Sequence, residues 1–485
     1  MALAGLGAAS DAVIELGHRF AASSHELALV GGCVRDVLTD KLGDDIDLTT
    51  DAVPEVVIEL LRGWADNVWD VGIKFGTVGA MRAGVRYEIT TYRSESYEAG
   101  SRKPAVEYGA TLSADLVRRD FTINAMALRL PDLDFVDEHD GLIDLARRLI
   151  RTPAGPQLSF GDDPLRMMRA ARFASQLGFY VEPSTVAAMS ELAPRLEIVS
   201  AERIRDELSK LLLTADPRSG LELLVNTGLA DVFLPELPAL RLEVDEHHHH
   251  KDVYEHSLTV LEQAIELERA HEPRSDPDLV LRLAALLHDI GKPKTRRFER
   301  GGSVSFHHHE VVGAKLVRRR LRALHYPRDV VDSVTRLVEL HLRFHGYAAG
   351  EWTDAAIRRY VRDADGELNR LHKLTRADCT TRNRRKAAAL AEAYSELELR
   401  ISVLGAAEEL SRVRPDLDGN QIMSILDLPP GRDVGLAYKF LLERRLDHGP
   451  VEPEVAEAEL VQWWNARQAG SPPAPPMSPE ELPRT

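Results

Sequence analysis

Two aspartates separated by one residue could hold a divalent metal ion near the start of this chain. Asp45 and Asp47 lie in the stretch DDIDLTT, which reads as a strand. Residues i and i+2 of a strand point to the same face, so both carboxylates project together at one strand end. Two acids held side by side repel each other unless a cation lies between them. Mg²⁺ prefers oxygen ligands and shares its shell with substrate phosphates, so the spacing predicts a magnesium site.

A pair of glycines precedes these aspartates. Gly31 and Gly32 follow an apolar run that predicts a short buried strand, and the next residues, VRDVLTD, have the apolar spacing of a helix. Glycines before a helix N-terminus let backbone N–H groups approach a phosphate. Ordinary turn chemistry explains such a pair, and a solvated strand end explains the aspartates. A phosphate cradle and metal-holding carboxylates within one segment, Leu29–Thr50, together indicate nucleotidyl transfer.

The combination GGxVRD followed by DIDLTT resembles the signature of the polymerase-β-like nucleotidyltransferases. More narrowly, it resembles the class II bacterial tRNA nucleotidyltransferase and poly(A) polymerase family. In that family an acid occupies a neighbouring strand, and Glu88 in VRYEITTYR takes this place. The resemblance therefore implies that Asp45, Asp47 and Glu88 are catalytic and hold one or two magnesium ions. An ordinary strand-face acid is the alternative for Glu88.

A second stretch, LVRRDFTINAMAL at 116–128, resembles another motif of the family. Arg119 can offer planar paired donors to a triphosphate. Asp120 and Asn124 are four residues apart and could brace the ribose or the loop. A helix N-terminus that carries an ion pair is the alternative. The resemblance implies that these residues bind the nucleotide together with three residues of the first motif, Gly31, Gly32 and Arg35.

The stretch FGDDPLRMMRAARFASQLGF predicts a half-buried helix with arginines on its polar side. Asp163 and Arg166 are three apart and are expected to be neighbours on one helix face, with Arg169 and Arg172 continuing the rows. Most such patterns are surface ion pairs. In the family this stretch is the nucleotide-selecting motif, and its usual Glu-Asp is Asp162-Asp163 here. A further helix over 200–213 is expected to brace the region.

Base chemistry explains why one aspartate and one arginine suffice for selection. Cytosine and adenine both present a ring-nitrogen acceptor beside an exocyclic amine, whereas uracil and guanine present a ring N–H and a carbonyl. A guanidinium donates to the acceptor and a carboxylate accepts from the amine. A mismatched buried contact costs about 1–3 kcal/mol or more. The pair therefore passes CTP and ATP and rejects UTP and GTP without a template.

A second set of metal-ligating residue types begins near residue 245. It resembles the HD phosphohydrolase superfamily, whose ligands are a histidine, a vicinal His-Asp and a distant aspartate. The resemblance assigns these roles to His256 in VYEHSL, His288 and Asp289 in LLHDIGKP, and Asp378 in LTRAD. His309 and His341 would be available for a second metal. Imidazole and carboxylate suit divalent transition ions, or Mg²⁺ with water. An active phosphohydrolase and an RNA scaffold both stay open for this domain.

Bulk composition limits the class of protein. The chain has 485 residues, enough for several domains, and a net charge of −16, which argues against a protein coated in nucleic acid. Local basic patches could still hold one RNA helix; the candidates are Arg147–Arg151, Arg318–Arg322 and Arg382–Lys386. The two cysteines, Cys33 and Cys379, imply no disulfide framework and suit a reducing cytoplasm. We find neither a signal peptide nor a membrane span.

These features predict an α+β nucleotidyltransferase head, in which helices accompany a small mixed sheet, followed by an all-α neck and body and an all-α HD domain. The expected boundaries are a head at 1–152, a helical neck and body for nucleotide selection and RNA contact at 153–244, an HD domain at 245–350 with Asp378 contributed later, a C-terminal helical region at 351–468, and a disordered tail at 469–485.

The predicted function is template-independent addition of CCA to the 3′ end of tRNA from CTP and ATP, with Mg²⁺ in the head. A poly(A) polymerase, or an enzyme adding only CC or only A on the same scaffold, is the nearest alternative. A metal phosphohydrolase with a vestigial head is another. A non-catalytic RNA-binding protein is disfavoured by the acidity of the chain. No feature of the sequence defines an oligomeric state.

Overall fold

The protein divides into two compact units in a computed structural model. One unit comprises Met1–Pro238 with Ala323–Tyr326, and the other comprises Ala239–Arg322 with Pro327–Thr485. The structure describes residues 10–39, 45–70, 72–73, 76–96, 105–108, 111–241, 252–271, 273, 275–299, 304–344, 352–379, 384–408 and 414–469. The predicted disordered tail at 469–485 lies, apart from its first residue, outside these ranges.

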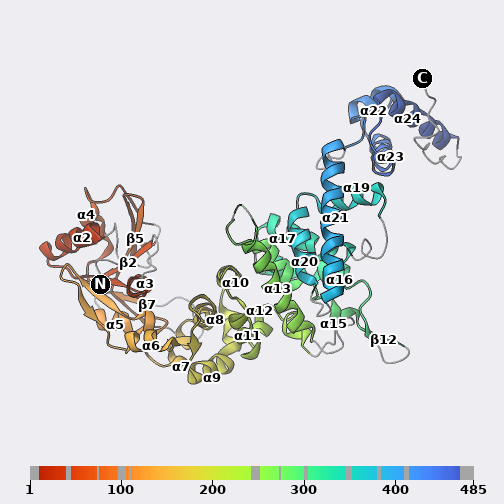
Figure 1. Cartoon of the computed structure of the whole chain (residues 1–485). Coiled ribbons are helices and arrows are strands. Elements are labelled where there is room, and N and C mark those ends of the chain that lie inside the picture. Colours follow the sequence, from red (N-terminus) through yellow and green to blue (C-terminus); the bar gives the residue numbers. More distant parts are fainter. Residues whose placement is uncertain are drawn as a thin grey trace. The chain divides into compact units, whose positions relative to one another are not determined.

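A seven-stranded mixed sheet organises the first unit (Figure 1). Its strand order is β3-β4-β5-β2-β1-β8-β9. The strands are β1 (Leu27–Val30), β2 (Asp45–Thr50), β3 (Asn67–Trp69), β4 (Thr77–Arg82), β5 (Val85–Thr91), β8 (Ala127–Leu130) and β9 (Asp134–Val136). The central pair β2 and β5 is parallel, and the other neighbours are antiparallel. The predicted α+β head with a mixed sheet is therefore confirmed.

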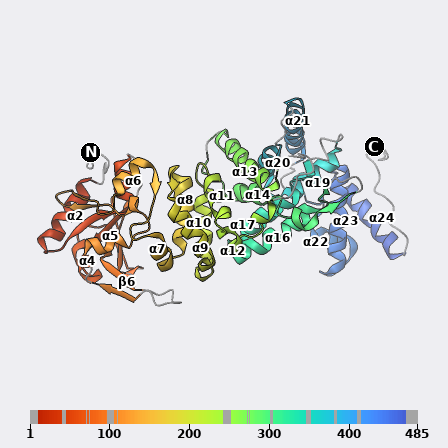
Figure 2. The same ribbon diagram turned by 90° about the horizontal axis from the view of Figure 1, so that it is seen from below.

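Strand alternation gives the sheet two apolar faces. In β1, Leu27 and Leu29 pack on one side, with α2 (Ser10–Ala22) and α4 (Pro54–Leu61). Ala28 and Val30 pack on the other side, with α5 (Leu112–Val117). Both faces of β1 are covered, which explains why this strand is one continuous apolar run. Figures 1 and 2 show these helices around the sheet.

Shorter elements complete the head. The helix after Gly31 is α3 (Gly32–Leu38), as the apolar spacing predicts. The others are β6 (Arg93–Ser96), β7 (Ala105–Tyr108), the 3-10 turn η3 (Thr122–Asn124), α6 (Gly141–Arg147) and β10 (Leu149–Ile150).

Helices form the rest of the first unit. They are α7 (Pro156–Asp162), α8 (Leu165–Leu177), α9 (Pro183–Leu192), η4 (Ala193–Ile198), α10 (Ala201–Leu212), α11 (Arg218–Asn226), α12 (Leu229–Phe233) and η5 (Pro238–Leu240), with the two-residue strand β11 (Tyr180–Val181) pairing with β10. The central helix α8 packs against both α10 and α11.

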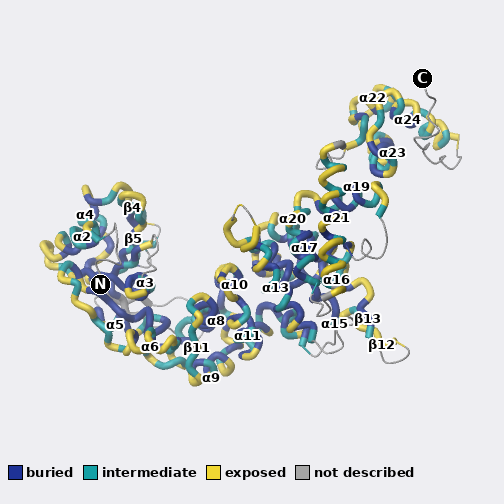
Figure 3. The backbone as a smooth tube through the Cα atoms, viewed as in Figure 1, coloured by how far each residue is buried: buried dark blue, intermediate teal, exposed yellow. Residues whose placement is uncertain are grey.

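The second unit is almost wholly helical. Its elements are α13 (Val253–Arg269), α14 (Leu279–Leu287), α15 (Lys292–Thr295), β12 (Arg297–Phe298), β13 (Val304–Ser305), α16 (His309–Ala323), α17 (Arg328–Leu340), α19 (Asp354–Ala364), α20 (Leu368–Asp378), α21 (Arg384–Glu408), α22 (Gly419–Leu426), α23 (Arg432–His448) and α24 (Pro453–Gln468). Helix α20 packs against α13, α14 and α17, and the last three helices have a small core of their own (Figure 3). The all-α prediction for this part is confirmed.

Two local predictions are wrong. Asp163 and Arg166 are not neighbours on one helix, because α7 ends at Asp162 and α8 begins at Leu165, with Asp163 in extended conformation between them. Pro164 explains the break, since a proline disfavours the helical region for the residue before it. Arg172 does not lie on a polar helix face, because its side chain is buried.

The predicted domain boundaries stay predictions, since the structure separates only the two units given above. Within the described ranges, no helix combines the length and the apolar character needed to cross a membrane.

Candidate active sites

Three carboxylates lie on one face of the head sheet. Asp45 and Asp47 are residues of β2, and Glu88 is directly opposite Asp47 on the parallel neighbour β5. The intervening residues Ile46 and Tyr87 point into the core on the other face. The alternation of both strands therefore puts the three acids on one face, as the spacing predicts for Asp45 and Asp47 and as the family resemblance implies for Glu88. Glu88 also accepts a hydrogen bond from Arg86, at 2.5 Å from Nη2 to Oε1.

The glycine turn lies beside this cluster. Gly31 has a φ of +72°, which favours glycine. A Cβ atom built on Gly31 would lie 3.1 Å from Nη1 of Arg119 and 3.6 Å from Oδ2 of Asp47. Burial raises the pKa of Asp47, Arg119 opposes this shift, and Glu88 and Asp45 raise the pKa further. The cluster therefore carries more negative charge than Arg119 balances, and it fits a divalent cation.

Arg119 is held by an acid that our sequence analysis did not single out. Asp115 is fully buried in α5 and pairs with both Arg118 and Arg119, with 2.9 Å between Arg119 Nη2 and Asp115 Oδ2. The spacing i, i+3 and i+4 from Asp115 in α5 to the two arginines just after the helix end was a signal that could have identified it. Asp115 fixes the arginine whose guanidinium lies next to Gly31.

Four predicted nucleotide-binding residues form a buried network instead of an open surface. Arg35 donates from Nη1 to Oδ1 of Asn124 at 2.7 Å, and Asn124 donates to Oδ1 of Asp120 at 3.0 Å. Asp120 accepts two hydrogen bonds from Arg169, of which that from Nε is 2.8 Å long. Arg35, Asp120 and Asn124 are all buried. The network links α3 and η3 of the head to α8.

The network continues into α10. Glu207, buried at 5% exposure, accepts from Nε of Arg172 at 2.7 Å and lies 3.7 Å from Nη1 of Arg169. Nothing in the local sequence pairs Glu207 with these arginines, so it was missed. Helix α10 therefore braces α8, the role expected for residues 200–213.

The predicted base-selecting residues lie on this same side of the unit. Arg166 donates from Nη2 to the carbonyl oxygen of Arg118 at 2.6 Å and from Nη1 to Oγ of Ser159 at 2.9 Å. Arg118 adjoins Arg119, so Arg166 connects directly to the segment beside the carboxylates. Asp163 accepts from the backbone N–H of Leu165 and, at 2.7 Å, from Nη2 of Arg203. Arg203 is a second contact that the sequence did not reveal.

The six predicted donors of the HD region lie together in the second unit. Two groups satisfy the geometry of a metal site, with ligand atoms within 4.8 Å of one another: His256, His288 and Asp378, and Asp289, His309 and His341. The helices α13, α14, α16, α17 and α20 supply them, and His288 and His341 are the capping residues of α14 and α17. Asp289 lies between the groups, with Oδ2 3.2 Å from His288 Nε2 and Oδ1 3.2 Å from His309 Nε2.

The same type of backbone hydrogen bond orients the imidazole rings of three of the histidines. The Nδ1 atoms of His288, His309 and His341 each hydrogen-bond the carbonyl oxygen three residues earlier, at 2.7 to 2.9 Å. This contact makes Nδ1 the donor and leaves the lone pair on Nε2. Among the residues that the structure describes, the buried Nε2 atoms of His309 and His341 have no hydrogen-bond partner, although Oδ1 of Asp289 lies 3.2 Å from that of His309. Both atoms therefore fit metal ligation.

The electrostatics of the cluster support this assignment. Burial alone would keep His288 neutral, but Asp289 and Asp378 raise its pKa to about 10. Burial and the charge of His288 lower the pKa of His341 to about 3. The side chain of Lys292 also contributes, with Nζ 2.9 Å from Oδ2 of Asp289. The buried carboxylates of Asp289 and Asp378 thus favour positive charge near them, and a divalent ion would supply that charge.

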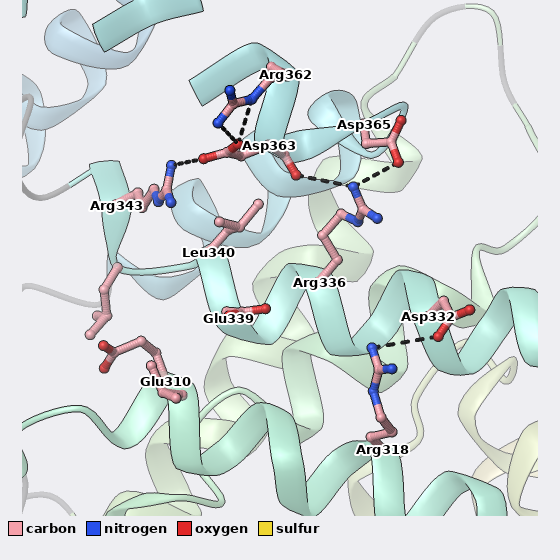
Figure 4. A pocket seen from close by; sticks show the side chains of 12 residues that line it. Glu310, Arg318, Asp332, Arg336, Glu339, Leu340, Arg343, Arg362, Asp363 and Asp365 are labelled. Carbon is pink, nitrogen blue, oxygen red and sulfur yellow. Dashed lines mark hydrogen bonds and ion pairs between the residues drawn. The ribbon is translucent and has the colours of Figure 1, made fainter. Parts of the chain in front are cut away.

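A cavity of about 980 Å³ lies elsewhere in this unit, lined by α16, α17 and α19 (Figure 4). None of the predicted metal donors lines it. Its arginines pair with aspartates: Arg318 with Asp332, Arg336 with Asp365, and Arg343 and Arg362 with Asp363. Because these charges compensate one another, the cavity is a poor site for an anionic ligand.

The basic patches differ in their exposure. In the patch at 147–151, Arg151 donates hydrogen bonds to the carboxylate of Asp144 and to the carbonyl oxygen of His139. In the patch at 318–322, Arg318 and Arg322 are exposed on α16. The first two residues of the patch at 382–386 lie outside the described part of the chain.

Family models match three successive parts of the chain. They are the Poly A polymerase head domain at residues 27–151, the "Probable RNA and SrmB- binding site of polymerase A" at 178–240, and the HD domain at 253–383.

Relatives give the same assignment. The A-adding tRNA nucleotidyltransferase of Deinococcus radiodurans is 34% identical over 453 residues, which cover 92% of this chain and 96% of that protein. The CCA-adding enzyme of Limosilactobacillus reuteri is 44% identical over 208 residues. That match covers 43% of this chain and about half of the relative, 50%.

Solved structures agree in fold. The Bacillus stearothermophilus CCA-adding enzyme in complex with CTP has a TM-score of 0.65 at 24% identity, covering 96% of this chain and 99% of that one. The Thermotoga maritima CCA-adding enzyme complexed with tRNA-CCA has a TM-score of 0.59 at 19% identity, covering 93% and 94%. The head is thus a nucleotidyltransferase domain joined to an HD domain. The chain belongs to the tRNA nucleotidyltransferase and poly(A) polymerase family.

Proposed function

We propose that this protein adds CCA to the 3′ end of tRNA from CTP and ATP without a template. The observation that carries the proposal is the carboxylate face of β2 and β5, with Gly31 and Arg119 beside Asp47. The names of the relatives support tRNA as the acceptor, and the structural neighbours bound to CTP and to tRNA-CCA support the substrates. A tRNA substrate also favours a cytoplasmic location.

The reaction joins the 3′-hydroxyl oxygen of tRNA to the α-phosphorus of CTP or ATP, and the bond from that phosphorus to pyrophosphate breaks. Asp45, Asp47 and Glu88 would hold Mg²⁺, which when bound offsets charge on the attacking and leaving oxygens. Arg119, fixed by Asp115, donates to the triphosphate next to Gly31. These groups act by positioning and by charge, the main terms in phosphoryl transfer.

Base selection falls to Asp163 and Arg166 in this proposal. Ser159 and the carbonyl oxygen of Arg118 orient the guanidinium of Arg166, and Arg203 orients the carboxylate of Asp163. The guanidinium of Arg166 and the carboxylate of Asp163, each oriented by its own partners, match in type the acceptor and amine shared by cytosine and adenine. The buried residues Arg35, Asp120, Asn124 and Arg172, together with the partly exposed Arg169, hold these two side chains in place through hydrogen bonds and ion pairs.

The test offers purified protein a tRNA lacking its 3′ end and a tRNA ending in CC, with CTP and ATP singly and together. We expect complete CCA with both nucleotides and CC with CTP alone. Addition of A only to the tRNA ending in CC would indicate the specificity named for the Deinococcus relative. A long A tract with ATP alone would indicate a poly(A) polymerase. No addition under any condition would refute nucleotidyl transfer.

A second activity is favoured by the histidine geometry of the HD region. The shared Nδ1 contacts leave Nε2 atoms directed at Asp289 and Asp378, and six donors in two groups would hold two divalent ions. Such a pair suits phosphoester hydrolysis, because it can generate a hydroxide and bind a phosphate oxygen.

The test measures bound metal by mass spectrometry and hydrolysis of 2′,3′-cyclic AMP with Mn²⁺, Ni²⁺, Co²⁺ or Mg²⁺. His309→Ala should lower metal content and hydrolysis. His308→Ala is the matched control, because its side chain is 83% exposed. Equal metal content and hydrolysis in wild type and His309→Ala would refute this activity and leave the proposal of CCA addition untouched.

A further inference from the structure

Within the described part of the chain, one edge of β2 has no strand partner at Asp45 and Asp47. On the β5 side, pairing runs along the whole strand, from Asp45 opposite Arg86 to Thr50 opposite Thr91. On the β1 side, pairing stops at Leu29 opposite Leu48, because the chain leaves β1 after Val30 and turns into α3. The residues that carry the proposed metal ligands thus extend beyond the end of their neighbouring strand.

A cysteine side chain takes the place of the missing strand. The backbone N–H of Asp47 donates to Sγ of Cys33 at 3.0 Å, and the thiol of Cys33 donates to the carbonyl oxygen of Asp45 at 3.2 Å. Residues two apart in a strand direct these backbone groups to the same edge, where a paired strand would normally satisfy them. Cys33 is 5% exposed, so water does not substitute for it.

These contacts join the two halves of the proposed site. Cys33 lies in the first turn of α3, directly after the glycines, and it contacts the backbone of both β2 aspartates. The direction of a strand end decides where its side chains project, and ligands are placed to within about 0.5 Å only when their support is rigid. One side chain therefore couples the position of Gly31 and Gly32 to that of the carboxylates.

We infer that Cys33 is a positioning residue, which holds the backbone of Asp45 and Asp47 so that their carboxylates receive the divalent ion of the head. This inference rests on the proposed nucleotidyl transfer for its catalytic consequence. It goes further by assigning a role to Cys33 in the first turn of α3. The role is hydrogen bonding by the thiol and not apolar packing, and the two can be separated by substitution.

The experiment compares Cys33→Ser, which keeps a donor and an acceptor, with Cys33→Val, which fills the space without either, in the full chain. Cys379→Ser is the matched control, because this second cysteine is a residue of the other unit. Three quantities are measured: amide hydrogen exchange of the peptide containing Asp47, the Mn²⁺ affinity of the head by electron paramagnetic resonance in a Asp289→Asn background, and the Mg²⁺ dependence of nucleotide addition. Thermal unfolding checks that each variant is folded.

We expect Cys33→Val to lose protection at the Asp47 amide and to bind the metal about tenfold more weakly, the usual effect of removing a group that orients a ligand. Cys33→Ser should remain within about threefold of wild type in both respects. The opposite order, with valine tolerated and serine impaired, would overturn the inference in favour of packing, as would wild-type behaviour of both. Amide exchange and Mn²⁺ binding report on Cys33 even if the wild-type protein adds no nucleotide, an outcome that would refute only the proposed function.

Discussion

In the head site, carboxylates and the guanidinium of Arg119 lie close to one another. Asp47 is pushed towards its neutral form by burial and by two neighbouring acids, whereas Arg119 favours its charged form. Arg119 cannot approach further, because Asp115 holds its other nitrogen. The remaining imbalance is the electrostatic reason why we propose a divalent cation at this site. In the proposed function, the missing side chain of Gly31 leaves room for the substrate phosphates beside Arg119 and Asp47.

The substitution Gly31→Ala tests whether the space beside Gly31 is needed for nucleotide binding. The φ of +72° costs a side chain about 1–2 kcal/mol, and the new Cβ would lie 3.1 Å from Nη1 of Arg119. We expect lower thermal stability and a KM for CTP and ATP raised about tenfold, the effect of one charged hydrogen bond. Gly63→Ala is the control, because Gly63 has a φ of +70° and open space around its Cβ. Equal KM values in the two variants would contradict a phosphate cradle at Gly31.

Asp120 predicts a pH dependence of stability. Burial opposes ionisation, but Arg169 and the Asn124 amide outweigh it and lower the pKa from 3.8 to about 2. The folded state thus binds this proton less tightly than the unfolded state. The resulting stabilisation is complete above about pH 4 and is lost as the pH falls towards 2.

The corresponding variant is Asp120→Asn, which leaves Arg169 without its carboxylate. At pH 7 we expect a loss of about 3 kcal/mol, as for other buried pairs that lose one partner. Calorimetry at pH 7 and pH 3 should show the difference from wild type shrinking at the lower pH. A difference independent of pH would mean that the pair contributes through shape and not through charge.

At the scale of elements, the junction of α7 and α8 positions Asp163 and Arg166, the residues proposed to select the base. Pro164 interrupts the helix, so that Asp163 leaves the helical path and meets Arg203 of α10. Two arginines of α8 make contacts outside the helix. Arg166 donates to the carbonyl oxygen of Arg118 in the head, and Arg172 donates to Glu207 in α10. In the proposed function, base selection therefore depends on three packed elements and not on one helix face.

Arg203→Ala should weaken this selection. Asp163 would lose the contact that orients it, and misincorporation of UTP and GTP relative to CTP and ATP should rise. The side chain of Arg203 is 53% exposed, so we expect a change of about two- to fivefold. The measurement is single-nucleotide addition to a truncated tRNA. Arg205→Ala, on the same helix, is the control, and an equal loss for all four nucleotides would contradict a role in selection.

At the scale of the whole molecule, each unit contains one complete candidate centre. The head carboxylates and the α8 region belong to one unit, and the six HD donors belong to the other. No donor of either centre is contributed by the other unit among the residues that the structure describes. The two chemistries should therefore be separable by mutation.

Reciprocal variants test this separation. Asp47→Asn should reduce nucleotide addition by at least about 100-fold and leave HD metal content and cyclic-phosphate hydrolysis unchanged. Asp289→Asn should abolish hydrolysis and leave nucleotide addition within about twofold. Both activities are measured on the same preparations. Loss of both in either variant would show that the centres depend on each other.

Local spacing explains what could be predicted from the sequence. The shared face of the β2 acids follows from a short pattern, because alternation in a strand is a local property. The donor set of the HD region was instead identified through its resemblance to the HD superfamily, since His256 and Asp378 are 122 positions apart. The mixed sheet and the helical remainder were also predictable, since apolar periodicity reports burial directly.

The supporting contacts were decided by the tertiary structure. Arg35 and Asn124 are 89 positions apart, Asp120 and Arg169 are 49 apart, and Arg172 and Glu207 are 35 apart. No periodicity connects such residues, because their pairing depends on how the head and the helices pack. The same holds for Cys33, whose thiol meets β2 only because β1 ends early. The residue types define the chemistry, and packing over long sequence distances determines which groups are free to perform it.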